Sequence, residues 1–305
     1  MSANRWSEIA YSRVPSVCRH ANKEKFFTHD AERFLTDVES GEKHISGATL
    51  LPHFLVMQAV EFAPAEKETP TWYGFKKRTV NFIGDAMREQ RRKLAETRAR
   101  FVDAQWATLL ARLRKAGELD NCIAVCDVSG SMGSIRETTL PGKSPCEVDP
   151  IWPTFSLSLV LARLAKPPFA DSFITFSSQS RVVVLDPEFK KVSLGATIQA
   201  MSRLDWGFEM DLNAVSLNLI LPLAIKNKVV KDEMIKQVFV FSDMQFDCAS
   251  TEDDPANWKT NHDVVERAYQ EAWYGVPEIV YWNLSRESIT APVTGEREGV
   301  ALLSG

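Results

Sequence analysis

One segment of the 305-residue sequence carries oxygen-bearing side chains at a spacing that suits a metal ion. Asp127, Ser129 and Ser131 alternate along the segment DVSGSM, directly after the apolar run CIAVC. In a turn, alternate side chains can converge on one point, and hard cations such as Mg²⁺ prefer oxygen ligands. One carboxylate and two hydroxyls supply too little charge alone, so the chemistry requires a second carboxylate from elsewhere in the chain.

Asp243 is the candidate for that second carboxylate, because it follows another apolar run, VFVFS. If the two runs form neighbouring strands, Asp127 and Asp243 face each other. Two carboxylates at such a short distance repel each other unless a cation lies between them. We therefore expect Asp127, Ser129, Ser131 and Asp243 to bind Mg²⁺ or Mn²⁺, with Ca²⁺ as a further candidate. The alternatives are a helix N-cap for the first three residues and a strand-end turn for Asp243.

Two regions with different patterns must position these side chains. Residues 1–118 read as helices, with a long helical pattern over 79–116. From residue 121 onward, short apolar runs alternate with helical patterns, which predicts an α/β fold with an open, mostly parallel sheet flanked by helices. The predicted strands are 122–128, 172–176, 181–185, 237–241 and 278–282, with 298–303 as a last one; the predicted helices are 155–165, 193–203, 213–226 and 261–274.

The DxSxS pattern after a buried strand resembles the metal-ion-dependent adhesion site of von Willebrand A domains. The phrases RVPSVC, NCIAVCDVSGSM, FVFSDMQFD and VYWNL resemble, more narrowly, a plant and fungal family of DUF2828/DUF7788-like proteins, itself similar to the Ro/TROVE ribonucleoprotein autoantigen. The resemblance implies a von Willebrand A (Rossmann-like) domain at 121–305. It also implies that 1–118 is the end of a TROVE-like helical domain.

The sequence departs from the family pattern in a second loop. The family reads Trp-Gly-x-Asn-Thr-Asp there, whereas residues 206–211 read WGFEMD. Met210 stands where the resemblance implies a threonine ligand, and a thioether is a poor ligand for a hard cation. Glu209 and Asp211 are the candidate replacements. The chain also stops after a predicted strand where the fold usually adds a helix, so a truncated form is one expectation.

A basic stretch in the long helical pattern is the candidate for an RNA-binding surface. Among residues 1–121, 20 are basic and 16 acidic, so only this half of the chain has the charge for it. The alternative is a solvated helix face, because Glu89 and Lys93, like Glu96 and Arg100, are four apart with the acid first. The candidate RNA contacts are Arg88, Arg91, Arg92, Lys93, Arg98 and Arg100.

The sequence contains no HExxH, CxxC, Gly-rich phosphate loop or serine nucleophile elbow, so we expect a binding protein and not an enzyme. The expected partner is a protein that offers an Asp or Glu carboxylate to the cation, with Ro-like RNA binding as the alternative. A metal-assisted hydrolase is the third hypothesis, with Glu209 as its candidate base. Five scattered cysteines and no apolar run long enough to span a membrane indicate the cytoplasm or, alternatively, the nucleus.

Overall fold

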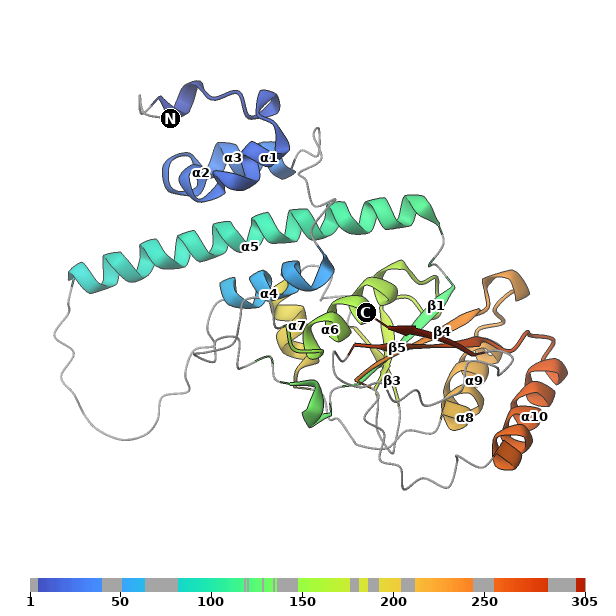
Figure 1. Cartoon of the computed structure of the whole chain (residues 1–305). Helices are drawn as coiled ribbons and strands as arrows, with labels where there is room; N and C mark the ends of the chain where they lie inside the picture. The colour runs from blue at the N-terminus through green and yellow to red at the C-terminus, as the bar shows by residue number, and fades with distance from the viewer. Residues whose placement is uncertain are drawn as a thin grey trace, which may run out of the picture. The chain divides into compact units, whose positions relative to one another are not determined.

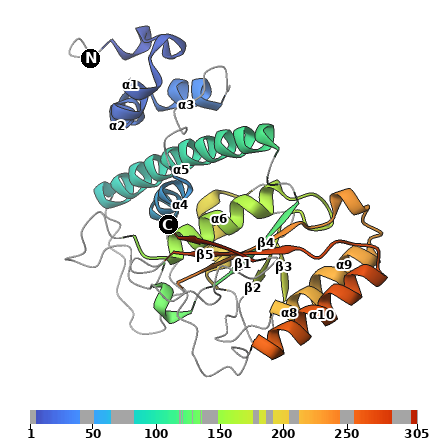
Figure 2. The same cartoon turned by 45° about the vertical axis from the view of Figure 1, so that its right-hand side comes forward.

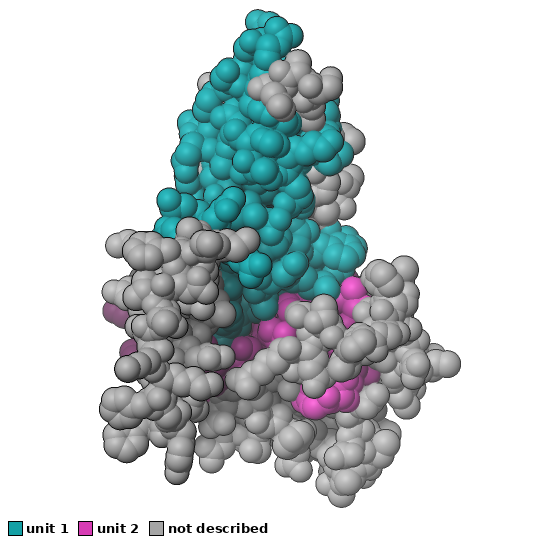
Figure 3. Space-filling view, turned by 90° about the vertical axis from the view of Figure 1, so that its left-hand side faces the viewer, with its two compact units in different colours: residues 1–111, 188–200 teal, residues 112–187, 201–305 magenta. Residues whose placement is uncertain are grey.

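The computed structural model describes residues 5–39, 51–63, 82–117, 119, 121–127, 129–133, 135, 148–175, 181–185, 192–203, 212–243, 255–284 and 300–304. The chain divides into two compact units, coloured separately in Figure 3. Unit 1 comprises Met1–Ala111 and Glu188–Ala200, and unit 2 comprises Arg112–Pro187 and Met201–Gly305. The units therefore interleave along the sequence, because a short segment beyond residue 121 belongs with the N-terminal helices.

Unit 1 is helical in the part that the structure describes, as the sequence predicts. Its elements are η1 (Trp6–Glu8), η2 (Tyr11–Arg13), α1 (Ser16–Ala21), α2 (Lys23–His29), α3 (Ala31–Glu39), α4 (Pro52–Phe62), α5 (Phe82–Ala116) and α7 (Leu194–Met201), the last two of which continue into unit 2. Pro52 occupies the first turn of α4, where its missing N–H costs nothing. Phe26, Phe34 and Phe101 meet in an aromatic core that joins α2, α3 and α5.

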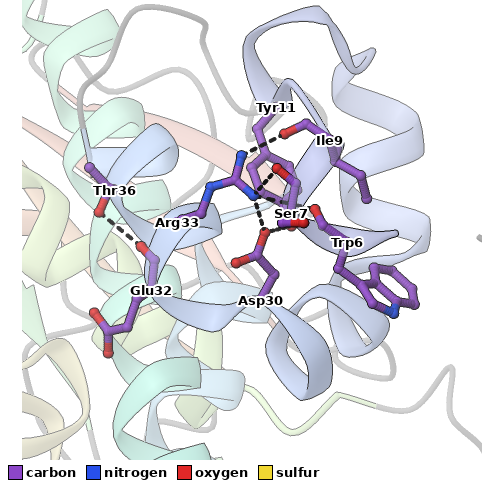
Figure 4. A network of polar contacts seen from close by, with 8 residues as sticks. All are labelled: Trp6, Ser7, Ile9, Tyr11, Asp30, Glu32, Arg33 and Thr36. Atoms are coloured by element: carbon purple, nitrogen blue, oxygen red, sulfur yellow. Dashed lines mark hydrogen bonds and ion pairs between the residues drawn. The ribbon is translucent and has the colours of Figure 1, made fainter. Parts of the chain in front are cut away.

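A polar network around Arg33 fixes the N-terminal segment onto this helical core (Figure 4). Its guanidinium nitrogens donate to three backbone carbonyl oxygens, those of Trp6, Ser7 and Ile9, at 2.8 to 3.3 Å. Arg33 also bonds the Asp30 carboxylate at 2.9 Å, and that carboxylate accepts the Tyr11 hydroxyl at 3.0 Å. One side chain of α3 thus binds the carbonyls in and just after η1 and ties this segment to the helical core.

Helix α7 joins unit 1 through contacts that depend on two particular residues. Asp103 of α5 accepts the backbone N–H of Leu194 at 2.8 Å and so caps the start of α7. Gly195 lies so close to α4 that a Cβ there would stand 2.3 Å from the carbonyl oxygen of Ala59. Only glycine permits that approach, and the helix packs closely for this reason.

Unit 2 is built around a six-stranded sheet, counted over the described residues (Figure 1). The strands are β1 (Cys122–Cys126), β2 (Ser172–Thr175), β3 (Val182–Val184), β4 (Gln237–Ser242), β5 (Glu278–Asn283) and β6 (Val300–Ser304), in the order β3-β2-β1-β4-β5-β6. Strand β3 is antiparallel to β2, and the other neighbours are parallel. The predicted α/β class and the mostly parallel sheet are confirmed.

Helices cover both faces of this sheet (Figure 2). Helix α6 (Ile151–Leu164) lies on one face, and α8 (Leu212–Val215), the π-helical turn η6 (Ser216–Ile220), α9 (Leu221–Lys226) and α10 (Pro255–Glu271) lie on the other. Ile123 and Val125 of β1 belong to the core beneath α8 to α10. Since side chains alternate along a strand, Cys122, Ala124 and Cys126 face α6. All five residues of β1 are buried, as its uninterrupted apolar sequence predicts.

Candidate functional site

The candidate site lies where β1 and β4 end, at the point from which the strand order runs in opposite directions. The two strands are parallel neighbours, and their register pairs Cys126 with Phe241. The next residues, Asp127 and Ser242, therefore also lie side by side, and Asp127 donates its backbone N–H to the carbonyl of Phe241 at 3.1 Å. Asp243 follows immediately. The two carboxylates thus come from adjacent strand ends, as the sequence reasoning required.

Asp127 organises the loop that carries the two predicted hydroxyls. Its side chain is buried, at 3% exposure. One carboxylate oxygen, Oδ1, accepts the backbone N–H of Ser129 at 2.8 Å, which is the local turn that aspartate favours. The hydroxyl oxygens of Ser129 and Ser131 then lie 3.1 Å apart. The structure therefore brings the two predicted hydroxyls together, in a loop whose backbone Asp127 holds.

Ser242 is a residue of the site that the sequence reasoning missed. Its hydroxyl donates to Oδ2 of Asp127 at 2.6 Å, in a fully buried contact between β4 and β1. This bond and the one from Ser129 hold both oxygens of Asp127 in fixed directions. A signal was available, because Ser242 directly precedes Asp243 and so reaches Asp127 once β1 and β4 are aligned as neighbours.

The electrostatics of the site are unfavourable for two negative charges. Burial raises the pKa of Asp127 above its ordinary value, and the charge of Asp243 acts in the same direction. The hydrogen bonds from Ser242 and Ser129 favour the ionised form and oppose this rise in the pKa of Asp127. Asp243 is itself only 2% exposed. A cation between the two carboxylates would remove this repulsion and favour the ionised form of Asp127.

Asp149 lies against the loop that carries the serines, and it is the second residue that the sequence reasoning missed. Gly133 ends that loop with a φ of +92°, and a Cβ there would stand 2.8 Å from Cβ of Asp149. Nothing in the sequence indicated this contact, because 15 residues without a recognisable pattern separate the two positions. The loop is thus held from Asp127 at one end and against Asp149 at the other.

Gly133→Ala is expected to weaken any cation binding at this loop, because an added methyl group collides with Asp149 and alanine disfavours a positive φ. The measurement is a comparison of cation affinity between this variant and the wild type by calorimetric titration. Gly275→Ala is the matched control, since nothing lies within 4 Å of a Cβ at that position. Equal affinities in all three proteins would contradict a role for the Gly133 conformation.

Three residues of the predicted site fall outside the described residues: Glu209, Met210 and Asp211. The structure therefore does not test whether either acid replaces the threonine that the resemblance implies. Within the described part of the chain, no group of three or more His, Cys, Asp or Glu side chains is placed to hold a metal ion. From the described residues alone, a cation at Asp127 and Asp243 would take hydroxyl and water oxygens as its remaining ligands.

The basic stretch of α5 is largely engaged in ion pairs within the protein. Arg92 contacts Glu89 at 2.7 Å and Glu96 at 2.6 Å. The other contacts are Lys93 with Glu89 at 3.9 Å, Arg98 with Glu24 and over the ring of Phe62, and Arg100 with Glu32 at 3.8 Å. Arg91 is exposed, and the side chain of Arg88 lies outside the described residues. The predicted helix-face pair of Glu89 with Lys93 is confirmed, and neighbouring acids offset much of the charge offered to RNA.

Comparison with known families accounts for both halves of the chain. Residues 121–305 match the family described as domain of unknown function DUF7788. The chain belongs to the DUF7788 family. Residues 1–119 match a second family, described as domain of unknown function DUF2828. The DUF7788 region begins one residue before β1, so it contains every strand of the sheet and the candidate site.

A relative of this chain is the uncharacterised protein L728 of Acanthamoeba polyphaga mimivirus, with 23% identity over the whole of this chain. The alignment covers 46% of that relative, so the chain spans about half the length of the curated protein it matches. No solved structure matches the chain. Among the described residues, no helix is both long and apolar enough to cross a membrane.

Proposed function

We propose that the DUF7788 region is a von Willebrand A-type domain that binds Mg²⁺ or Mn²⁺ and presents the ion to a protein partner. The ligands in this proposal are Asp127, Ser129, Ser131 and Asp243, partly through water. One observation carries it. Two buried carboxylates end adjacent parallel strands, and two hydroxyl oxygens 3.1 Å apart lie in the loop that the first carboxylate fixes.

The sheet topology supports a ligand site at this position. The order β3-β2-β1-β4-β5-β6 is that of doubly wound α/β folds. In such folds, ligands bind beyond the carboxyl ends of the strands, at the point where the strand order reverses. That point lies between β1 and β4, and Asp127 and Asp243 occupy it.

The chemistry of the donors fits a hard divalent cation. Carboxylate and hydroxyl oxygens suit Mg²⁺ and Mn²⁺, whereas thiolate and imidazole ligands suit softer metals. Ser242 and the Ser129 N–H orient the Asp127 carboxylate before any ion arrives. Because the protein offers few negative charges, a bound ion would remain electrophilic and attract an Asp or Glu carboxylate from the partner.

The contacts of α5 favour protein binding over Ro-like RNA binding. Arg92, Arg98 and Arg100 each face an acidic side chain of the same protein, so a phosphate would have to displace an existing partner. A metal-assisted hydrolase requires a base near the ion, and the candidate for that role, Glu209, lies outside the described residues. Among the residues that the structure describes, no contact favours either rival.

Calorimetric titration of Mg²⁺ and of Mn²⁺ into the metal-free full chain tests the proposal. Saturable heat is expected in the wild type and none in Asp127→Ala, which loses the carboxylate that fixes the loop. Asp263→Ala is the matched control, because Asp263 is exposed on α10 and should leave the heat unchanged. The absence of saturable heat in the wild type would sink the proposal.

A further inference from the structure

Three buried hydroxyl groups in unit 2 have no hydrogen-bond partner among the described residues. They belong to Thr154 and Ser158 of α6 and to Thr175 at the end of β2, and each of these residues is 0% exposed. Burying a hydroxyl without a partner is costly, and native proteins rarely leave such groups unsatisfied. Three of them in one structural layer therefore require an explanation.

The three hydroxyls lie in the layer between α6 and the sheet. Helix α6 packs against β1 and β2. Cys126 of β1 and Thr175 of β2 are register partners, so their side chains lie on the same face of the sheet, the one that α6 covers. Burial raises the pKa of the Cys126 thiol while Ser158 acts to lower it, so Ser158 lies close to that thiol without forming a well-oriented hydrogen bond. Thr154 is one helical turn from Ser158, on the same side of α6.

One end of this layer lies near the carboxyl end of β1, where Asp127 is found. Helix α6 connects β1 to the parallel strand β2, so it runs antiparallel to both. The hydrogen bond from the Asp171 N–H to the carbonyl of Ala162 places the last turn of α6 at the start of β2. Thr154, in the first turn of α6, therefore lies at the end of the layer nearest Asp127.

We propose that this layer binds ordered water through the hydroxyls of Thr154, Ser158 and Thr175, behind the strand end that carries Asp127. Polar buried sites take up water that makes about three hydrogen bonds to otherwise unsatisfied groups, whereas apolar sites stay dry. The three hydroxyls and the Cys126 thiol supply such partners from three elements. The water joins α6 to β1 and β2 by hydrogen bonds from hydroxyls that have no partner among the described residues. This inference does not depend on the proposed cation binding.

The sign of a stability change tests the proposal. Three single substitutions each remove one hydroxyl with little change of shape: Thr175→Val, Thr154→Val and Ser158→Ala. Each is expected to lower the melting temperature, because a bound water loses a hydrogen-bond partner. If the layer is dry, removing an unsatisfied hydroxyl raises the melting temperature instead. Ser156→Ala is the matched control on the same helix, since its buried hydroxyl already donates to the carbonyl of Pro153 at 3.0 Å.

Two further measurements test the proposal: the stability of a double variant and a crystal structure that shows bound water. If one water bridges two hydroxyls, Thr154→Val with Thr175→Val is expected to cost less than the sum of the single changes. A high-resolution crystal structure of the full chain is expected to show water bonded to at least two of the three hydroxyls. A raised or unchanged melting temperature in all three single variants, or a layer without water in the crystal, overturns the proposal.

Discussion

Asp127→Asn is expected to raise the thermal stability of the metal-free protein and to abolish the stabilisation that Mg²⁺ gives to the wild type. The asparagine keeps the shape of the side chain, so its Oδ1 still accepts the Ser129 N–H and its amide group can donate to the Ser242 hydroxyl. It removes one of two buried carboxylates that repel each other. The same substitution removes the charge that attracts a cation, so the sign of its effect reverses when Mg²⁺ is added.

The expected size of the reversal follows from ligand linkage. At a Mg²⁺ concentration 100 times the dissociation constant, the wild type gains about 2.7 kcal/mol, which corresponds to roughly 5–10 °C in melting temperature for a domain of this size. Scanning calorimetry of both proteins, in chelator and in Mg²⁺, measures it. Asp263→Asn is the control that should follow the wild type in both conditions. A lower melting temperature for Asp127→Asn in chelator would show that the ionised carboxylate stabilises the metal-free fold.

The pH dependence of the metal-free protein provides an independent measure of the same repulsion. Burial raises the pKa of Asp127 in the folded state above its ordinary 3.8, so the folded protein takes up a proton more readily than the unfolded chain. The contribution of Asp127 to stability therefore becomes more favourable as the pH falls from neutral through that raised pKa toward 3.8. The difference between the wild type and Asp127→Asn in chelator is expected to shrink over this window. A constant difference would contradict the raised pKa.

Local patterns were sufficient to predict the part of the site that lies along single strands. Asp127 and Asp243 each end an uninterrupted apolar run, and such runs form buried parallel strands. The spacing of Ser129 and Ser131 predicted their convergence. The contact of Gly133 with Asp149 could not be predicted, because it depends on the path of the intervening chain and not on any local preference.

The set of elements that make up unit 1 also could not be predicted fully from local sequence patterns. The helical pattern predicted α7, but its place beside α4 and α5 depends on the Asp103 cap and on the close approach that Gly195 permits. The ion pairs of the basic residues of α5 could likewise be predicted only in part. The contact of Glu89 with Lys93 follows from helix geometry, whereas Glu24 and Glu32 reach the helix from distant positions in the sequence. Contacts of this kind require the folded chain.

Asp37→Ala is expected to destabilise unit 1 by about 3–5 kcal/mol, because it leaves the buried charge of Arg19 without its carboxylate. Arg19 of α1 is 1% exposed, and its Nη1 donates to Asp37 of α3 at 2.6 Å. The Nε of Arg19 has no hydrogen-bond partner among the described residues. The contact with Asp37 therefore provides more of the energy that offsets the burial of the Arg19 charge. Urea unfolding followed by helical circular dichroism measures the loss.

Arg19→Met tests whether burial of the charge, and not loss of the contact, causes the effect. Methionine fills much of the buried volume without a charge, and the Asp37 side chain that remains is 18% exposed, so water can still reach it. The expected loss is therefore smaller than for Asp37→Ala, although both variants remove the same contact. Arg92→Met is the control, since its ion pairs with Glu89 and Glu96 are exposed and should contribute little. Equal losses for Arg19→Met and Asp37→Ala would mean that the contact itself, and not the desolvated guanidinium, determines the stability of this helical core.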